Sequence, residues 1–212
     1  MRPFITIIIV SLTMIACNNA NHQIHAYIPK SIHIPDTLNN WYAKLFDYKY
    51  YLRKKEITKQ LNLSNLESDT SNVEIRIWVM ASNYNPQKIY FLKDTNNVWT
   101  ISNLNYYVNF SDWNKPKIDS IAYQRVNDKT ISANDLKELN LAKIWTLPSQ
   151  SEMKNGSSFG CVDGYALLIE MSNKEKYKYL FYMCPDFHIS KDSTFKIADS
   201  FNKSADKILN KQ

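Results

Sequence analysis

Glycine is scarce in this sequence, with three among 212 residues. Loops that cradle phosphate groups need glycine, because the backbone there must approach the ligand closely. The chain also lacks the G-x-S-x-G sequence of serine hydrolases, the H-E-x-x-H sequence of zinc proteases and a phosphate-binding loop. These absences argue against the enzyme classes that carry a recognisable motif, and no cofactor or metal site is predicted.

The N-terminal apolar run is too short to span a bilayer. It covers residues 4–16, which is 13 residues, whereas a membrane-spanning helix needs about 20. Arg2 precedes the run, Ala16 ends it, and Cys17 follows it. A positive charge before about 7–15 apolar residues is typical of a secretory signal peptide. An N-terminal core helix is the alternative, but no polar face runs through the stretch.

The sequence Met14-Ile15-Ala16-Cys17 resembles the lipobox of bacterial lipoproteins, although leucine is usual at the first position. The resemblance implies removal of residues 1–16 and a Cys17 that carries a diacylglycerol and an N-linked acyl chain such as palmitate. Two or more chains anchor a protein stably in a membrane. Residues 18–21 contain none of the acids that send some relatives to the cell surface. We therefore expect an outer-membrane anchor that faces the periplasm.

The net charge of +6 raises the question of a nucleic-acid partner. The basic residues are dispersed, however, and acids follow many of them, as in Lys93-Asp94 and Lys137-Glu138. The densest group is Arg53-Lys54-Lys55, followed by Glu56, which is typical of a solvated helix face. No nucleic-acid partner is predicted, and weak attraction to anionic lipid headgroups stays open.

Three cysteines are present. If Cys17 carries lipid, Cys161 and Cys184 remain, and export would bring them into an oxidising compartment where cysteines commonly pair. A bond between them would contribute about 3 kcal/mol on the chain-entropy model. Two buried free thiols are the alternative. A catalytic thiol is disfavoured, because only His188 lies near either cysteine as a basic neighbour.

The hydrophobic pattern predicts a flexible tether over residues 17–35 and a single α+β domain over residues 36–212. Asp36 can cap an N-terminal helix, and a second short helix is expected over residues 56–67. The apolar positions of the first helix are Leu38, Trp41, Tyr42, Leu45, Tyr48 and Leu52.

An antiparallel meander is expected next, because short connections cannot join parallel neighbours. Its strands are predicted over residues 73–79, 88–93, 98–102, 106–110 and 117–126. Asp94-Thr95-Asn96-Asn97 is expected to form a hairpin turn. A capping box that starts at Ser132 predicts a short middle helix, and a mobile loop is expected over residues 149–160.

A C-terminal hairpin and a C-terminal helix packed on the sheet complete the predicted fold. The hairpin register that leaves one face apolar pairs Glu170 with Lys176 and sets Cys184 opposite Val162. Asp192 or Ser193 can cap the last helix. Over residues 145–210 the chain is similar to small lipoproteins of Bacteroidota-type bacteria, on short elements such as Trp145-Thr146-Leu147-Pro148-Ser149 and Cys184-Pro185. That resemblance implies no activity, so no functional residues carry over.

Three functions stay open for a membrane-anchored envelope lipoprotein. The preferred one is a non-catalytic module that binds a protein partner. A glycan-binding protein is the first alternative, because exposed tyrosine and tryptophan rings can stack on sugars. The second is a hydrolase with a site near Asp163 and His188, the latter being the only histidine of the predicted domain.

Overall fold

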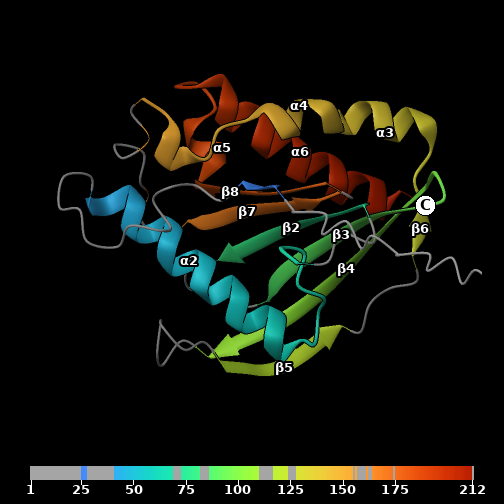
Figure 1. The fold of residues 1–212 in the computed structure, drawn as a ribbon, viewed down its shortest axis with the longest axis horizontal. Helices are drawn as coiled ribbons and strands as arrows, with labels where there is room; N and C mark the ends of the chain where they lie inside the picture. The colour runs from blue at the N-terminus through green and yellow to red at the C-terminus, as the bar shows by residue number, and fades with distance from the viewer. Residues whose placement is uncertain are drawn as a thin grey trace, which may run out of the picture.

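The computed structural model describes residues 25–27, 41–68, 73–81, 86–109, 117–123, 128–154, 156, 161, 164–173 and 175–211. These residues form an α+β fold with one antiparallel, meander-like sheet and helices near both ends of the chain (Figure 1), which confirms the predicted fold class. The predicted signal peptide, Cys17 and Asp36 lie outside the described residues.

Strands and helices are mixed along the described part of the chain. The strands are β1 (His25–Tyr27), β2 (Val73–Ala81), β3 (Gln87–Thr95), β4 (Val98–Asn109), β5 (Lys117–Tyr123), β6 (Lys129–Thr130), β7 (Tyr165–Ser172) and β8 (Lys176–Met183). The helices are α2 (Trp41–Gln60), α3 (Ala133–Leu139), α4 (Leu141–Thr146), α5 (Pro185–His188) and α6 (Ser193–Asn210), with a 3-10 turn, η2 (Gln150–Glu152).

The strand order is β1-β8-β7-β2-β3-β4-β5, and β6 pairs with β4. All neighbours are antiparallel except β1, which runs parallel to β8. The turn between β3 and β4 lies where the sequence predicts it. Asn96 and Asn97 both have positive φ there, as a two-residue hairpin turn requires.

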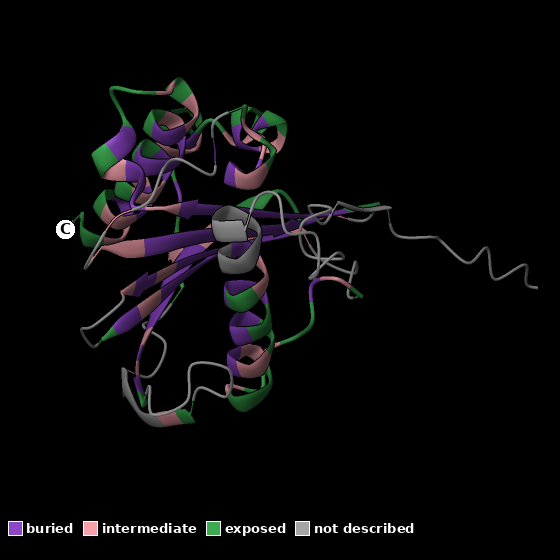
Figure 2. Cartoon of the chain, turned by 90° about the vertical axis from the view of Figure 1, so that its left-hand side faces the viewer, coloured by how far each residue is buried: buried purple, intermediate pink, exposed green. Residues whose placement is uncertain are grey.

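Helices cover both faces of the sheet (Figure 2). The first core contains Ile75 and Ile77 of β2 and packs against α3, α4 and α6, whereas the second contains Trp78 and Met80 of β2 and packs against α2. Alternate residues of each central strand are therefore buried on opposite faces. For this reason the sequence of β7 is apolar at almost every position.

Two predictions about α2 are wrong. The helix continues to Gln60, and turns follow it where a second helix was expected. Leu52, expected in the core, is 41% exposed, whereas Arg53 and Lys54, expected on a solvated face, are buried. The buried Glu170 of the sheet explains part of the difference, because Lys54 of α2 pairs with it, while Tyr50, Tyr51 and Ile57 supply the apolar contacts of the helix.

The predicted register of the C-terminal hairpin is also wrong. Glu170 lies opposite Tyr179, and Ser172 lies opposite Tyr177. Cys184 donates its backbone N–H to the carbonyl of Tyr165 over 2.8 Å. The prediction assumed that charged residues face solvent, which fails here because both faces of the hairpin are covered.

Asparagine rather than glycine adopts most of the left-handed conformations. Among the described residues with positive φ, four are asparagines, one is Cys184, and neither described glycine is among them. Asn140, with φ of 50°, ends α3 and separates it from α4. The predicted caps are confirmed, because the side chain of Ser132 accepts a hydrogen bond from Asp135 N and that of Asp192 accepts one from Thr194 N. The chain therefore reaches the left-handed backbone region with few glycines. Asparagine takes these positions, because it tolerates positive φ better than most other residues that have side chains.

The segment that follows α4 covers the outer edge of β8. Ser149 and Gln150 are buried, contrary to the mobile loop expected from residue 149 onward. Ser149 Oγ accepts the backbone N–H of Phe181 at 2.9 Å, and Gln150 Oε1 accepts that of Met183 at 2.7 Å. The two side chains satisfy strand groups that would otherwise form an open edge.

Replacing Ser149 with alanine should lower the free energy of unfolding by about 1–3 kcal/mol, because the buried N–H of Phe181 loses its acceptor. Chemical denaturation measures the loss, and amide exchange at Phe181 should speed up in parallel. Ser190, an exposed turn residue, is the matched control, and its replacement by alanine should change little. An unchanged exchange rate at Phe181 would contradict the assignment.

Candidate functional site

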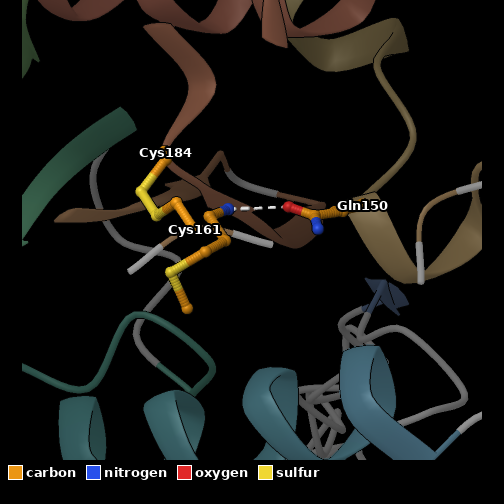
Figure 3. Close-up of a disulfide and its surroundings, with 4 residues drawn as sticks. Gln150, Cys161 and Cys184 are labelled. Atoms are coloured by element: carbon orange, nitrogen blue, oxygen red, sulfur yellow. Dashed lines mark hydrogen bonds between the residues drawn. A yellow bond between two sulfur atoms is a disulfide. The ribbon is translucent and has the colours of Figure 1, made fainter. Parts of the chain in front are cut away.

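The structure brings Cys161 and Cys184 together in a disulfide at the end of β8 (Figure 3), with their Cα atoms 6.3 Å apart. This separation lies within the usual range for disulfides. Cys184 is fully buried and has a left-handed backbone conformation with φ of 45°. Gln150 lies near the pair, and its side chain accepts the backbone N–H of Met183, the residue before Cys184.

Gly164 makes the space for this disulfide. A Cβ atom added there would overlap Cys184 Sγ and approach Cys161 Sγ far inside van der Waals contact. Gly164 does not have positive φ, so an alanine would be acceptable to the backbone itself. The glycine is therefore required by the sulfur atoms rather than by its own conformation.

Of the two residues considered for a hydrolase site, the structure describes His188 alone. Asp163 lies outside the described residues. His188 is buried in α5, with its ring 5.2 Å from that of Phe195 of α6. Glu170 points to the opposite face of the sheet, where it contacts Lys54 of α2. The described histidine, cysteine and carboxylate side chains also form no group that could hold a metal ion.

The densest assembly of polar groups is a buried ion-pair cluster between α2 and the sheet. At its centre, Glu170 accepts hydrogen bonds from Lys54 Nζ at 2.9 Å, from Arg76 Nη1 at 3.3 Å and from Tyr177 Oη at 3.3 Å. We call this set the Glu170 cluster. Its members are Tyr51, Lys54, Glu67, Glu74, Arg76, Lys93, Glu170 and Tyr177.

The outer members of the cluster provide additional partners for the two central cations. Lys54 also contacts Glu67 at 3.2 Å, and Arg76 Nε contacts Glu74 at 2.6 Å. Lys93, at the edge, pairs with Glu74 at 3.0 Å. Opposite charges thus alternate through the cluster, as buried ions require.

Local electrostatics keep Glu170 ionised. Burial alone would raise its pKa, but the positive charges of Lys54 and Arg76 and the hydrogen bonds from Lys54 and Tyr177 outweigh burial, and the pKa of Glu170 lies below its ordinary value. Burial and the nearby Glu170 carboxylate raise the pKa of Tyr177. A carboxylate held ionised by two cations suits a structural ion pair, and a general acid would need the opposite shift.

Tyrosine rings surround the ammonium group of Lys54. Its Nζ lies 5.0 Å from the ring centroid of Tyr51, 5.7 Å from that of Tyr177 and 5.9 Å from that of Tyr179. Such contacts favour a desolvated cation. Sequence patterns missed this site because residues that bond to one another in it lie up to 123 positions apart. The available signal was Glu170 itself, a charge within an otherwise apolar strand.

The opposite face of the sheet holds a second buried lysine. Lys178 Nζ donates hydrogen bonds to the carbonyls of Trp145 and Leu147, both at 2.6 Å. These carbonyls lie at the C-terminal end of α4, where backbone acceptors lack intrahelical partners. Burial lowers the pKa of Lys178. Glu170 and Lys178, which were both expected on a solvated face of the hairpin, therefore have structural roles.

Comparison of the chain with protein-family models, with curated protein sequences and with solved structures found no match. Within the described residues, none of the helices combines the length and the apolar character needed to cross a membrane.

Proposed function

We propose that this chain is a lipid-anchored protein of the bacterial cell envelope whose domain is a non-catalytic module for binding a protein partner. The observation that carries the proposal is the N-terminal order of Arg2, a short apolar run, Ala16 and Cys17. This order matches a signal peptide that ends in a lipobox. Lipid on Cys17 would tether the domain to the outer membrane, on its periplasmic side.

The disulfide supports export. Bonds between cysteines persist in the periplasm and are rare in the cytosol, and Cys161 and Cys184 lie in bonding position. The third cysteine, Cys17, belongs to the lipobox and is the residue that the proposed modification would use.

The assignment of the domain to binding rather than catalysis is supported by how its ionisable groups are used. Glu170 and Lys54 are occupied by ion pairs in the core, and His188 packs against an aromatic ring. A protein partner is favoured over a glycan, because Phe187 is the one exposed aromatic residue among the described side chains. Glycan recognition usually needs several accessible rings.

Lipidation of Cys17 is tested by intact-mass analysis of protein purified from its native host. We expect loss of residues 1–16 and an added mass equal to a diacylglycerol and an acyl chain. The Cys17→Ser variant should lack the lipid mass and leave the membrane fraction. A native protein that retains residues 1–16, or whose Cys17 is a free thiol, would contradict the proposal.

A further inference from the structure

We infer that the domain has a fixed orientation on the membrane, with the bilayer facing the end of the sheet where β8 begins. This inference rests on the proposed lipidation of Cys17 and names the lipid surface as the partner of that end. It follows from where β1 joins the sheet and from the length of chain between Cys17 and β1. We call the two ends of the sheet the β8-start end and the α5 end.

The pairing of β1 sets the point at which the tether reaches the domain. β1 runs parallel to β8, with His25 opposite Lys176 and Tyr27 opposite Lys178. The chain therefore joins the sheet beside the first residue of β8. Because β1 pairs with only the first three residues of β8, the attachment lies at one end of that strand and not at its middle.

The β8-start end also carries the tight turn between β3 and β4. Glu74 pairs with Ser172 of β7, and Val73 pairs with Asp94 of β3, so the start of β2 and the end of β3 lie at this end. Val98 follows the turn and is 50% exposed. The C terminus lies at the same end, and α5 lies toward the other (Figure 1).

β1 lies within residues 17–35, which were predicted as the tether, and the part that remains between Cys17 and β1 is too short to let the domain turn over freely. His25 lies eight residues after Cys17. A flexible chain of eight residues spans about 16 Å on average and at most about 28 Å. β8 itself, with eight residues, extends over about 26 Å. The α5 end could touch the bilayer only if the tether lay almost fully stretched along the sheet.

Exposed apolar side chains alone would favour the opposite orientation. Phe187, at 67% exposure, and Ile189 form an apolar tip at the α5 end, and Lys191 lies next to them in sequence. Such a tip resembles a membrane-inserting loop. The attachment of β1 at the β8-start end would instead hold this apolar tip away from the bilayer. The exposed apolar side chains and the tether therefore predict opposite orientations of the domain.

The test uses the full lipoprotein in vesicles of phosphatidylethanolamine and phosphatidylglycerol that contain lipids with nitroxide headgroups. Single thiols are introduced by Val98→Cys and Phe187→Cys and carry the same fluorophore, because Cys161 and Cys184 are bonded. The label at position 98 should be quenched at least about twofold more than the label at position 187, since the tether holds its end near the headgroups. Equal quenching, or stronger quenching at position 187, would overturn the orientation.

Breaking the β1 pairing tests its cause. Two prolines, Ala26→Pro and Tyr27→Pro, remove backbone donors from the strand. The first described residue after them is Trp41, 24 residues from Cys17, and a flexible chain of that length spans about 27 Å on average. The quenching ratio should then approach one. The matched control places prolines within the predicted tether, Ala20→Pro and Asn21→Pro, and should keep the ratio.

Flotation of each sample with its vesicles separates the two possible failures. Protein that stays at the bottom of the gradient lacks the anchor, which overturns the proposed function and the orientation together. Protein that floats and yet shows no excess quenching at position 98 retains the anchor and overturns the orientation alone.

Discussion

Replacing Glu170 with alanine should lower the free energy of unfolding by about 3 kcal/mol, the lower part of the range for breaking a buried ion pair. The loss leaves Lys54 and Arg76 without their shared carboxylate in a site where both are almost fully buried. The cost stays near the lower limit because Lys54 keeps Glu67 and Arg76 keeps Glu74. Urea denaturation monitored by tryptophan fluorescence measures the change.

Glu175→Ala is the control for this measurement. Glu175 lies on the same hairpin and is exposed, so its loss should change the unfolding free energy by less than about 0.5 kcal/mol. A cycle with Lys54→Met, Glu170→Leu and the double variant tests whether the two residues act as a pair. The double variant should be more stable than the sum of the single effects predicts, by about 0.5–3 kcal/mol. Additive effects would contradict direct coupling.

The same carboxylate should make stability depend on acid pH. Because the pKa of Glu170 is lowered in the folded state, its ionised form contributes stability above the ordinary glutamate pKa of about 4.3. That contribution is lost as the pH falls through the lowered folded-state value. Glu170→Gln should therefore be closer in stability to the unmodified protein at acid pH than at pH 7. A constant difference between them would show that the carboxylate charge does not matter.

Local signals in the sequence were sufficient for much of the secondary structure. The N-cap at Ser132, the N-cap at Asp192 and the turn at Asn96 and Asn97 each depend on a few adjacent residues, and all three are present. The alternation over Val73 to Val79 predicts β2 correctly, because one residue in two is buried on each face. These features need no knowledge of the rest of the chain.

Placement of the charged residues could not be predicted in the same way. The prediction placed the charged residues on a solvated face of the sheet. In the structure, helices pack on both faces, so the central strands have no solvated face. Arg76 lies opposite Glu170 only because β2 pairs with β7, which follows it by more than 80 residues. The Glu170 cluster therefore depends on a long-range pairing that neither the helix nor the strand pattern contains.

Replacing Gly164 with alanine should lower the free energy of unfolding by about 3 kcal/mol, either by forcing the backbone to move or by preventing the disulfide. The added methyl group would occupy the space of both sulfur atoms. Either the backbone moves, which typically costs about 1–3 kcal/mol for an overpacked site, or the disulfide fails to form. In the second case, the chain loses about 3 kcal/mol of loop constraint over 23 residues of separation. Thermal unfolding and thiol titration under denaturing conditions measure the two effects.

The decisive comparison places the same substitution in a chain without the disulfide. In a Cys161→Ala/Cys184→Ala background the sulfur atoms are absent, and the backbone of Gly164 does not have positive φ. There Gly164→Ala should cost less than about 1 kcal/mol, because alanine also restricts the unfolded chain more than glycine does. An equal cost in both backgrounds would mean that contacts other than the sulfurs require the glycine. A large cost only in the bonded protein would show that Gly164 serves the disulfide.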